Sequence, residues 1–220
     1  MTFPPRLIDG YRAFAATRLP VERSRFERLA ETGQQPEVMI IGCCDSRVSP
    51  EVIFDAHPGE LFVVRNVANL VPPYSVTGFT HGVSAAIEFA VLGLKVKHIV
   101  VLGHSRCGGI RAFIERRHHP DEHDFIANWM ALITPAAQRL EDDGAAEKAD
   151  YVTRLEQASI VATIENLKTF PWVGERVERQ ELQLLGAYFN VATGLLEVYH
   201  PGNASFEPVP AAMPGDRAAE

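Results

Sequence analysis

The sequence predicts an α/β fold: a mainly parallel central sheet flanked by helices, with an N-terminal helical extension and a C-terminal edge strand or hairpin. Three short apolar runs are each followed by a glycine or a polar residue, which is typical of buried strands. An Ala- and Leu-rich segment between the second and third runs is typical of a helix. Because strands that alternate with helices usually form parallel sheets, this order indicates α/β architecture.

Length and composition favour a single domain at residues 1–220, since one domain of this size buries a full hydrophobic core. Hydrophobic residues make up 46% of the chain and charged residues 22%, as in ordinary soluble globular proteins. The formal net charge of -7 argues against nucleic acid as a partner, because binding phosphates needs clustered Lys and Arg. A small-molecule substrate is the better expectation.

Targeting signals and cysteine usage bear on the compartment. No apolar run is long enough for a secretory signal or a membrane span, so we expect a cytoplasmic protein without a membrane partner. Three cysteines in a chain of this length do not suggest a disulfide framework. In an intracellular setting they indicate metal binding or nucleophilic chemistry.

Residues 1–35 are predicted to form an N-terminal helical arm. Their apolar residues recur with a mostly helical period that Pro20 interrupts, so we expect one or two amphipathic helices. Strands are then expected at 38–41, 61–64 and 99–102, with a helix at 83–94.

Beyond the third strand, apolar periodicity predicts helices at 111–117, 124–133 and 147–168. Two further apolar segments, 181–190 and 194–200, flank a short connection and predict a hairpin or an added edge strand. The Pro-rich segment 201–220 is expected to be an irregular tail.

Chemically capable residues follow each of the three predicted strands. Cys43 follows the first strand, Arg65 and Asn66 follow the second, and His104 follows the third. The carboxyl ends of parallel strands share one edge of a sheet, and ligands bind along that edge. Topology alone therefore brings these distant residues together.

The segment from His104 to Cys107 offers two metal ligands three residues apart, and Cys43 supplies a third. Zinc favours thiolate and imidazole ligands, and catalytic zinc sites use three protein ligands with a fourth position for water. The alternative is that these cysteines are small buried hydrophobic residues. Cys43 and Cys44 should point to opposite faces, so both should not bind one ion, but spacing alone does not say which one does.

The paired motifs Cys-Cys-Asp-Ser-Arg at 43–47 and Gly-His-Ser-Arg-Cys-Gly-Gly at 103–109 resemble the signature of the β-class carbonic anhydrases. The resemblance, which is to the plant-like branch, extends over roughly residues 34–114. It implies one zinc ion per subunit, held by Cys43, His104 and Cys107, with Cys44 as a bystander. It also implies reversible hydration of carbon dioxide to bicarbonate and a proton.

The same resemblance implies that Asp45 and Arg47 form a catalytic dyad. Asp45 would orient the nucleophile while Arg47 holds its carboxylate. In isolation, such a pair is more often an ordinary surface ion pair. Some relatives use this Asp as a fourth zinc ligand in a closed, inactive state. The variant that favours closure carries a Trp where this chain has Ile40, so closure is less expected here.

For the substrate, the plant-like branch implies a pocket that takes carbon dioxide or bicarbonate. Its residues here are Gln34, Phe62, Val67, Phe89 and Gly108. Gln34 would donate an amide hydrogen bond, and the apolar side chains would form a wall for an uncharged molecule. Phe89 stands where the family has a Tyr. Without the resemblance, Phe62 and Phe89 would be interpreted as core residues.

Several other residues receive structural interpretations. His118, His119 and His123 lie in a charged segment and are expected on the surface. His57 and His81 are expected to be structural. Glu88 lies in an apolar helical segment, where a buried carboxylate would need polar partners.

Two other functions fit the same pattern. A hydrolase of carbonyl sulfide or carbon disulfide would need no new catalytic group, and a non-catalytic zinc protein would have a closed, four-ligand site. The family resemblance also implies a homodimer or homotetramer, with contacts through the N-terminal helices and sheet edges and with the pocket near a subunit boundary.

Overall fold

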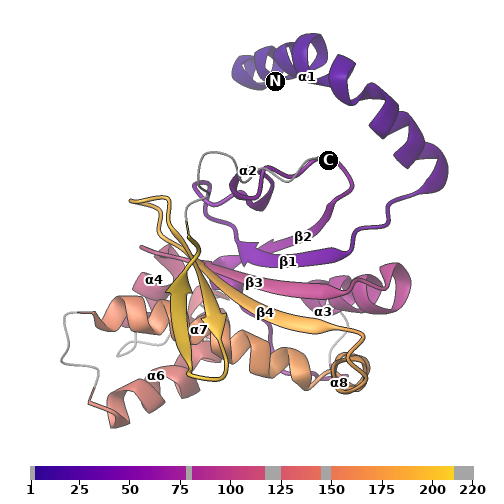
Figure 1. Cartoon of the computed structure of the whole chain (residues 1–220). Helices are drawn as coiled ribbons and strands as arrows, with labels where there is room; N and C mark the ends of the chain where they lie inside the picture. Colours follow the sequence, from indigo (N-terminus) through magenta and orange to yellow (C-terminus); the bar gives the residue numbers. More distant parts are fainter. Residues whose placement is uncertain (1–2, 78–80, 117–124, 145–149, 211–220) are drawn as a thin grey trace.

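The computed structural model describes residues 3–77, 81–116, 125–144 and 150–210 (Figure 1). These residues contain one sheet of six strands in the order β2-β1-β3-β4-β5-β6. The first three neighbouring pairs are parallel and the last two are antiparallel, which confirms the predicted mainly parallel sheet. The strands are β1 Val38–Cys43, β2 Leu61–Asn66, β3 His98–His104, β4 Gln183–Phe189, β5 Leu196–His200 and β6 Ser205–Pro208.

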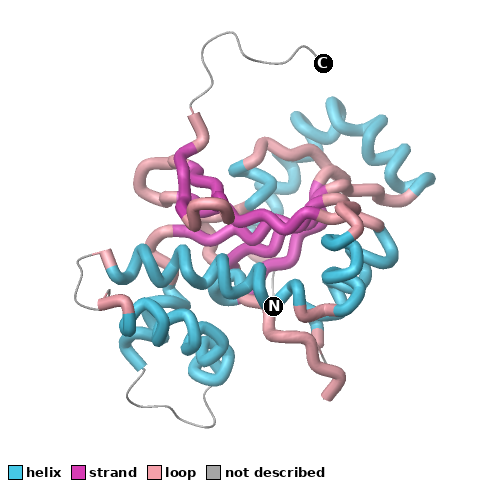
Figure 2. The backbone as a smooth tube through the Cα atoms, turned by 60° about the horizontal axis from the view of Figure 1, so that its bottom comes forward, coloured by secondary structure: helices cyan, strands magenta, loops and turns pink. Residues whose placement is uncertain are grey.

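Helices connect the parallel strands and gather mainly on one side of the twisted sheet (Figure 2). In the described ranges the α-helices are α1 Pro5–Thr32, α2 Pro50–Ile53, α3 Gly82–Glu88, α4 Gly108–Arg116, α5 Phe125–Met130, α6 Thr134–Asp142, α7 Tyr151–Lys168 and α8 Pro171–Glu178. A π-helical segment, η2 Phe89–Leu94, continues α3, and two 3-10 turns are η1 Val67–Asn69 and η3 Ala131–Ile133. No helix of the described residues combines the length and apolar character that a membrane crossing requires.

One face of the sheet carries the main hydrophobic core. Met39, Ile41 and Ile99 on this face pack under α3, α7 and α8, which cover it in Figure 1. Ile160 and Phe170 are fully buried against these strands. Burial of this apolar surface is the main force that fixes the helices on the sheet.

The opposite face is much less covered. Ile40 and Leu102 are buried on it, and α2 contributes Ile53. Beside them lies a hollow of about 330 Å³ lined entirely by apolar residues, namely Val38, Ile40, Phe54, Leu61, Val100, Leu185, Gly186, Ala187, Leu196 and Val198. We refer to this hollow as the open apolar face.

The N-terminal arm is a single helix, α1, and Pro20 lies inside it without ending it. Glu22 is the only buried residue of α1, all of which is described. The helix stands away from the sheet in Figure 1. Glu22 Oε1 lies 2.6 Å from His57 Nδ1, and Arg25 Nη1 donates to Glu60 Oε1 at 3.0 Å, so polar contacts attach the arm to the segment before β2.

The C-terminal hairpin is confirmed, because β5 returns antiparallel to β4. The expectation of an irregular tail from residue 201 is wrong for β6, whose Phe206 pairs with Tyr199 of β5. Phe206 also packs its ring against Tyr188, so apolar burial orders this segment despite its prolines. The segment with His118, His119 and His123, and residues 211–220, lie outside the described residues.

Three described helices, α2, α6 and α8, have no counterpart in the sequence prediction. Each has a proline in its first turn, namely Pro50 in α2, Pro135 in α6 and Pro171 in α8. Proline is favoured there, because its missing N–H would have no intrahelical partner and its fixed φ suits a helix.

Candidate metal centre

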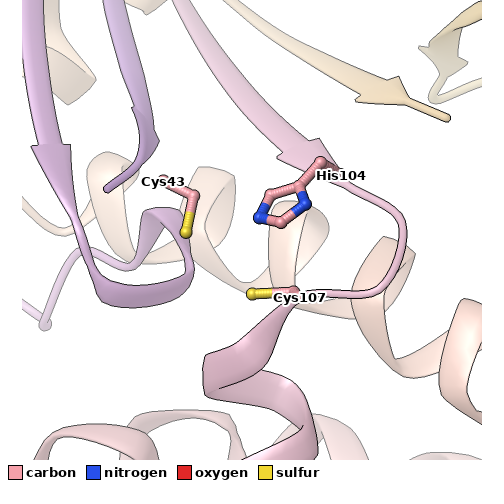
Figure 3. Close-up of side chains that lie close together, drawn as sticks. All are labelled: Cys43, His104 and Cys107. Atoms are coloured by element: carbon pink, nitrogen blue, oxygen red, sulfur yellow. The ribbon is translucent and has the colours of Figure 1, made fainter. Parts of the chain in front are cut away.

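Three side chains meet at the carboxyl edge of the sheet. Cys43 ends β1, His104 ends β3, and Cys107 directly precedes α4. Their ligand atoms lie within 4.8 Å of one another, and Figure 3 shows both sulfur atoms and the imidazole ring turned toward a common point. All three are buried, with exposed fractions of 5%, 1% and 3%. Among the described residues, no other group of His, Cys, Asp and Glu is arranged in this way.

The adjacent cysteine does not join this group. Cys44 is exposed, whereas Cys43 is buried. This difference in exposure is what the alternation of side chains along an extended segment predicts.

His104 is oriented to offer one nitrogen to a metal ion. Its Nδ1 lies 2.9 Å from the carbonyl oxygen of Ser105, which accepts a hydrogen bond when Nδ1 carries the proton. Its Nε2 is buried without a hydrogen-bond partner. A buried polar atom without a partner is costly, so this nitrogen fits a metal ligand.

The two sulfur atoms are surrounded by backbone donors. The backbone N–H groups of Asp45 and Ala68 contribute to lowering the pKa of Cys43, and those of Gly109 and Ile110 oppose the rise in the pKa of Cys107. The last two belong to the first turn of α4, where the helix dipole also favours a negative charge. These donors stabilise thiolates.

The thiols also interact with each other. Their mutual hydrogen bond lowers the pKa of Cys43 and raises that of Cys107, because one proton is shared between two sulfur atoms. A divalent cation would take the place of that proton and hold both groups as thiolates. The donor set of two thiolates and one imidazole therefore fits a soft or borderline metal ion.

Asp45 and Arg47 form a bidentate pair beside this cluster. Arg47 Nε donates to Asp45 Oδ1 at 2.8 Å, and Arg47 Nη2 donates to Oδ2 at 2.7 Å. Hydrogen bonding from Arg47 holds the pKa of Asp45 well below its usual range, so the carboxylate stays ionised. Arg47 Nη2 also donates to the carbonyl oxygen of Arg106 at 3.1 Å, which ties the pair to the loop that carries Cys107.

The loop between His104 and Cys107 is tight. Arg106 adopts a left-handed φ of 57°, a conformation that residues other than glycine rarely take. Gly109 serves packing instead. A Cβ on Gly109 would lie 2.8 Å from Val67 Cγ1 and 3.1 Å from Ala68 Cβ, so only glycine lets α4 approach η1 this closely.

Sequence reasoning gave no role to Arg65, although it located this residue at the same edge. Arg65 Nε donates to the carbonyl oxygen of Cys43 at 2.8 Å, and Nη2 donates to that of Asp45 at 2.6 Å. This one side chain fixes the backbone on both sides of Cys44. Its position directly after an apolar run was the available signal.

Two carboxylates were also misjudged. Glu88, for which burial was considered, is exposed. Glu156 of α7, for which the sequence predicted no role, is only 2% exposed and accepts a hydrogen bond from the backbone N–H of Cys107 at 2.9 Å. It lies 49 residues from Cys107 in the sequence, so no local motif links the two.

The expected pocket residues divide into two groups. Val67 follows β2 and Gly108 follows Cys107, so both adjoin the cluster. Phe62 instead pairs with Met39, four residue pairs before Cys43 pairs with Asn66. Phe62 therefore lies about 13 Å along the strands from the level of Cys43. Phe89 packs on Phe62 with ring centroids 5.8 Å apart, and Gln34 precedes β1 and is exposed. A single chain does not bring these three residues to the cluster.

Comparison with known proteins agrees with this geometry. The carbonic anhydrase family model matches residues 38–196, which include all three cluster residues. The chain is 34% identical over 197 residues to beta carbonic anhydrase 3 of Arabidopsis thaliana, covering 88% of this chain and 76% of the relative. It is also 34% identical over 216 residues to a carbonic anhydrase of Synechococcus elongatus, covering 96% and 78%.

Solved structures show the same relationship. The β-carbonic anhydrase CcaA superposes with a TM-score of 0.84 at 30% identity, over 94% of this chain and 92% of that one. A tetrameric β-carbonic anhydrase of Sordaria macrospora superposes with a TM-score of 0.76 at 30% identity, over 88% and 94%. With sequence, fold and cluster in agreement, the chain belongs to the β-class carbonic anhydrase family.

Proposed function

We propose that this protein catalyses the reversible hydration of carbon dioxide to bicarbonate and a proton, with one zinc ion per subunit. The observation that carries the proposal is the buried Cys43–His104–Cys107 cluster with an ionised Asp45 held beside it. Zinc bound there would supply a Lewis acid that makes water nucleophilic near neutral pH. Three protein ligands leave a fourth position for that water.

Asp45 would orient the nucleophile. As a carboxylate it accepts a hydrogen bond from the attacking water or hydroxide and thereby directs an oxygen lone pair toward carbon dioxide. The side chain and the backbone N–H of Arg47 both hold Asp45 in this role, and the N–H donates to Asp45 Oδ1 at 3.0 Å. For Asp45 to become a fourth metal ligand it would have to leave Arg47, so the arrangement supports the open, catalytic state.

The substrate pocket would be completed by a second copy of the chain. Val67 and Gly108 lie on the metal side, whereas Gln34, Phe62 and Phe89 lie at the other end of the strands. If these five residues line one pocket, the last three belong to a partner subunit. The resulting apolar wall suits an uncharged, linear substrate.

The surface of the single chain supports a homodimer or homotetramer. The open apolar face is lined only by apolar residues, and α1 exposes Leu7, Tyr11 and Val21 by 56%, 66% and 81%. Exposed apolar surface of this extent is typical of contact sites. The Sordaria relative is described as tetrameric. Sedimentation analysis would test this, and a monomer at micromolar concentration would contradict both the assembly and the shared pocket.

The decisive experiment measures metal content and carbon dioxide hydration separately. We expect purified protein to contain one zinc per chain and to accelerate hydration in a stopped-flow assay at mildly alkaline pH. Asp45→Ala should retain the zinc and lose most of the activity. Zinc-loaded protein that failed to hydrate carbon dioxide would overturn the proposal, and faster turnover of carbonyl sulfide would redirect it to the sulfur analogues.

A further inference from the structure

A buried carboxylate lies directly behind the metal cluster. Glu156 lies in the second turn of α7, next to the fully buried Leu155, and it is 2% exposed. A carboxylate at such a position is costly unless both oxygens have partners. The described fold supplies two donors.

Each oxygen of Glu156 accepts one hydrogen bond. Oε1 accepts from the backbone N–H of Cys107 at 2.9 Å, and Oε2 accepts from the hydroxyl of Tyr188 at 2.7 Å. Tyr188 is on β4 and is 3% exposed. Burial, together with the adjacent Glu156 carboxylate, raises the pKa of Tyr188, so its hydroxyl keeps the proton that it donates. Glu156 thus links a core tyrosine to the backbone of a metal ligand.

This link acts on the Cys107 end of the His104–Cys107 loop, where Arg47 also holds the carbonyl oxygen of Arg106. At the other end, Ser105 is bound to the segment that follows β4: its N–H donates to Phe189 O at 3.0 Å, and its Oγ accepts from the N–H of Val191 at 2.9 Å. The backbone N–H of Cys107 has Glu156 as its acceptor. Fixing that nitrogen restricts the backbone conformation of Cys107, which sets the direction of its side chain and therefore the position of its sulfur atom.

We propose that Glu156, held by Tyr188, is a positioning residue that fixes Cys107 in the geometry required for metal binding. The inference rests on the proposed function only in that Cys107 is taken as a metal ligand. Glu156 does not touch the metal position. Outer-shell groups of this kind change metal affinity by about 10-fold to 100-fold when they are removed.

Four variants test the role. Glu156→Ala removes the acceptor, and Glu156→Gln keeps an oxygen for the Cys107 N–H while its amide group donates to the Tyr188 hydroxyl. Tyr188→Phe removes the second hydrogen bond without touching Cys107. The matched control is Ser159→Ala, since Ser159 is 1% exposed on the same helix and its hydroxyl donates only to the backbone carbonyl of Glu156, at 2.7 Å.

The readouts are zinc affinity, measured by competition with a chelator, and the thiolate-to-metal absorption bands of the cobalt-substituted protein. We expect about 10-fold to 100-fold weaker zinc binding and altered bands in Glu156→Ala. Glu156→Gln should restore affinity and spectrum, and Tyr188→Phe should weaken binding by about 10-fold. Ser159→Ala should match wild type.

Wild-type affinity in Glu156→Ala would overturn the inference, as would a Glu156→Gln variant no better than Glu156→Ala. If Glu156→Ala does not fold, Tyr188→Phe tests the role instead. A zinc affinity of Tyr188→Phe equal to that of Ser159→Ala would then refute the role of Glu156. Because these readouts use metal binding alone, they stand apart from the hydration assay. Wild-type protein that bound zinc normally but did not hydrate carbon dioxide would refute the proposed function. The comparison of zinc affinities among the four variants would still test the role of Glu156.

Discussion

The two ends of the parallel strands are built differently. At the carboxyl end, backbone and side-chain donors surround Cys43, and the bidentate contacts of Arg47 fix Asp45. At the amino end, Phe89 is 52% exposed and Gln34 is also exposed in the single chain. The candidate metal centre therefore lies within one chain, whereas the proposed substrate pocket would need a second copy of the chain. Variants can separate these two requirements.

The largest effect is expected from a metal ligand. Cys43→Ser should abolish stoichiometric zinc and with it carbon dioxide hydration, since a hydroxyl replaces a buried thiolate. Cys44→Ser, one residue away but exposed, should keep both. Elemental analysis of the two purified proteins checks this, and zinc loss in Cys44→Ser instead would reverse the ligand assignment.

The next effect separates metal binding from chemistry. Asp45→Asn removes the charge that Arg47 holds and should lower kcat for hydration by about 100-fold or more, with zinc retained. Metal content and stopped-flow rates measured on one preparation check this. A variant with full activity would show that Asp45 is only part of a surface ion pair.

The amino end can be tested by complementation. Phe89→Asp should bind zinc normally but hydrate carbon dioxide poorly, because the proposed pocket loses its apolar wall. The Phe89→Asp chain is then dissociated, mixed with an equal amount of the zinc-free Cys43→Ser chain and reassociated. About half of the dimers are then hybrids, and each hybrid has one intact site of its two, so the mixture should recover about a quarter of the wild-type activity. No recovery, with hybrids shown to form, would place both groups of residues in one chain.

The smallest effect is expected from packing at the carboxyl end. Gly109→Ala would place a Cβ 2.8 Å from Val67 Cγ1 and should destabilise the fold by about 1–3 kcal/mol in denaturant titration. At Gly108, the neighbouring glycine, nothing lies within 4 Å of an added Cβ, so Gly108→Ala should unfold as wild type does. Equal stability of the two variants would mean that α4 can move away from η1.

Sequence reasoning succeeded where topology decides the outcome. Residues after parallel strands share an edge, so Cys43 and His104 could be placed together across 61 positions of the chain. It was less successful where tertiary packing overrides a local signal. Phe206 pairs with Tyr199 and orders a strand in a segment expected to be irregular.

Other features had no local signal at all. Glu156 resembles any acidic residue of an amphipathic helix until α7 is packed behind Cys107. The distance of Phe62 from the metal cluster depends on the register between β1 and β2. Phe62 pairs with Met39 rather than with Cys43, so it lies far from the cluster although its strand ends beside it. Both facts require the assembled sheet.

The two halves of α1 have different consequences for protease sensitivity. The half after Pro20 is attached by Glu22 and Arg25, whereas the half before it contains no buried residue. That outer half carries the trypsin sites Arg6, Arg12 and Arg18. An isolated chain should lose it quickly to trypsin, and an assembled one should keep it if the arm lies against a partner. The rate of cleavage at these arginines therefore reports assembly without any measurement of catalysis.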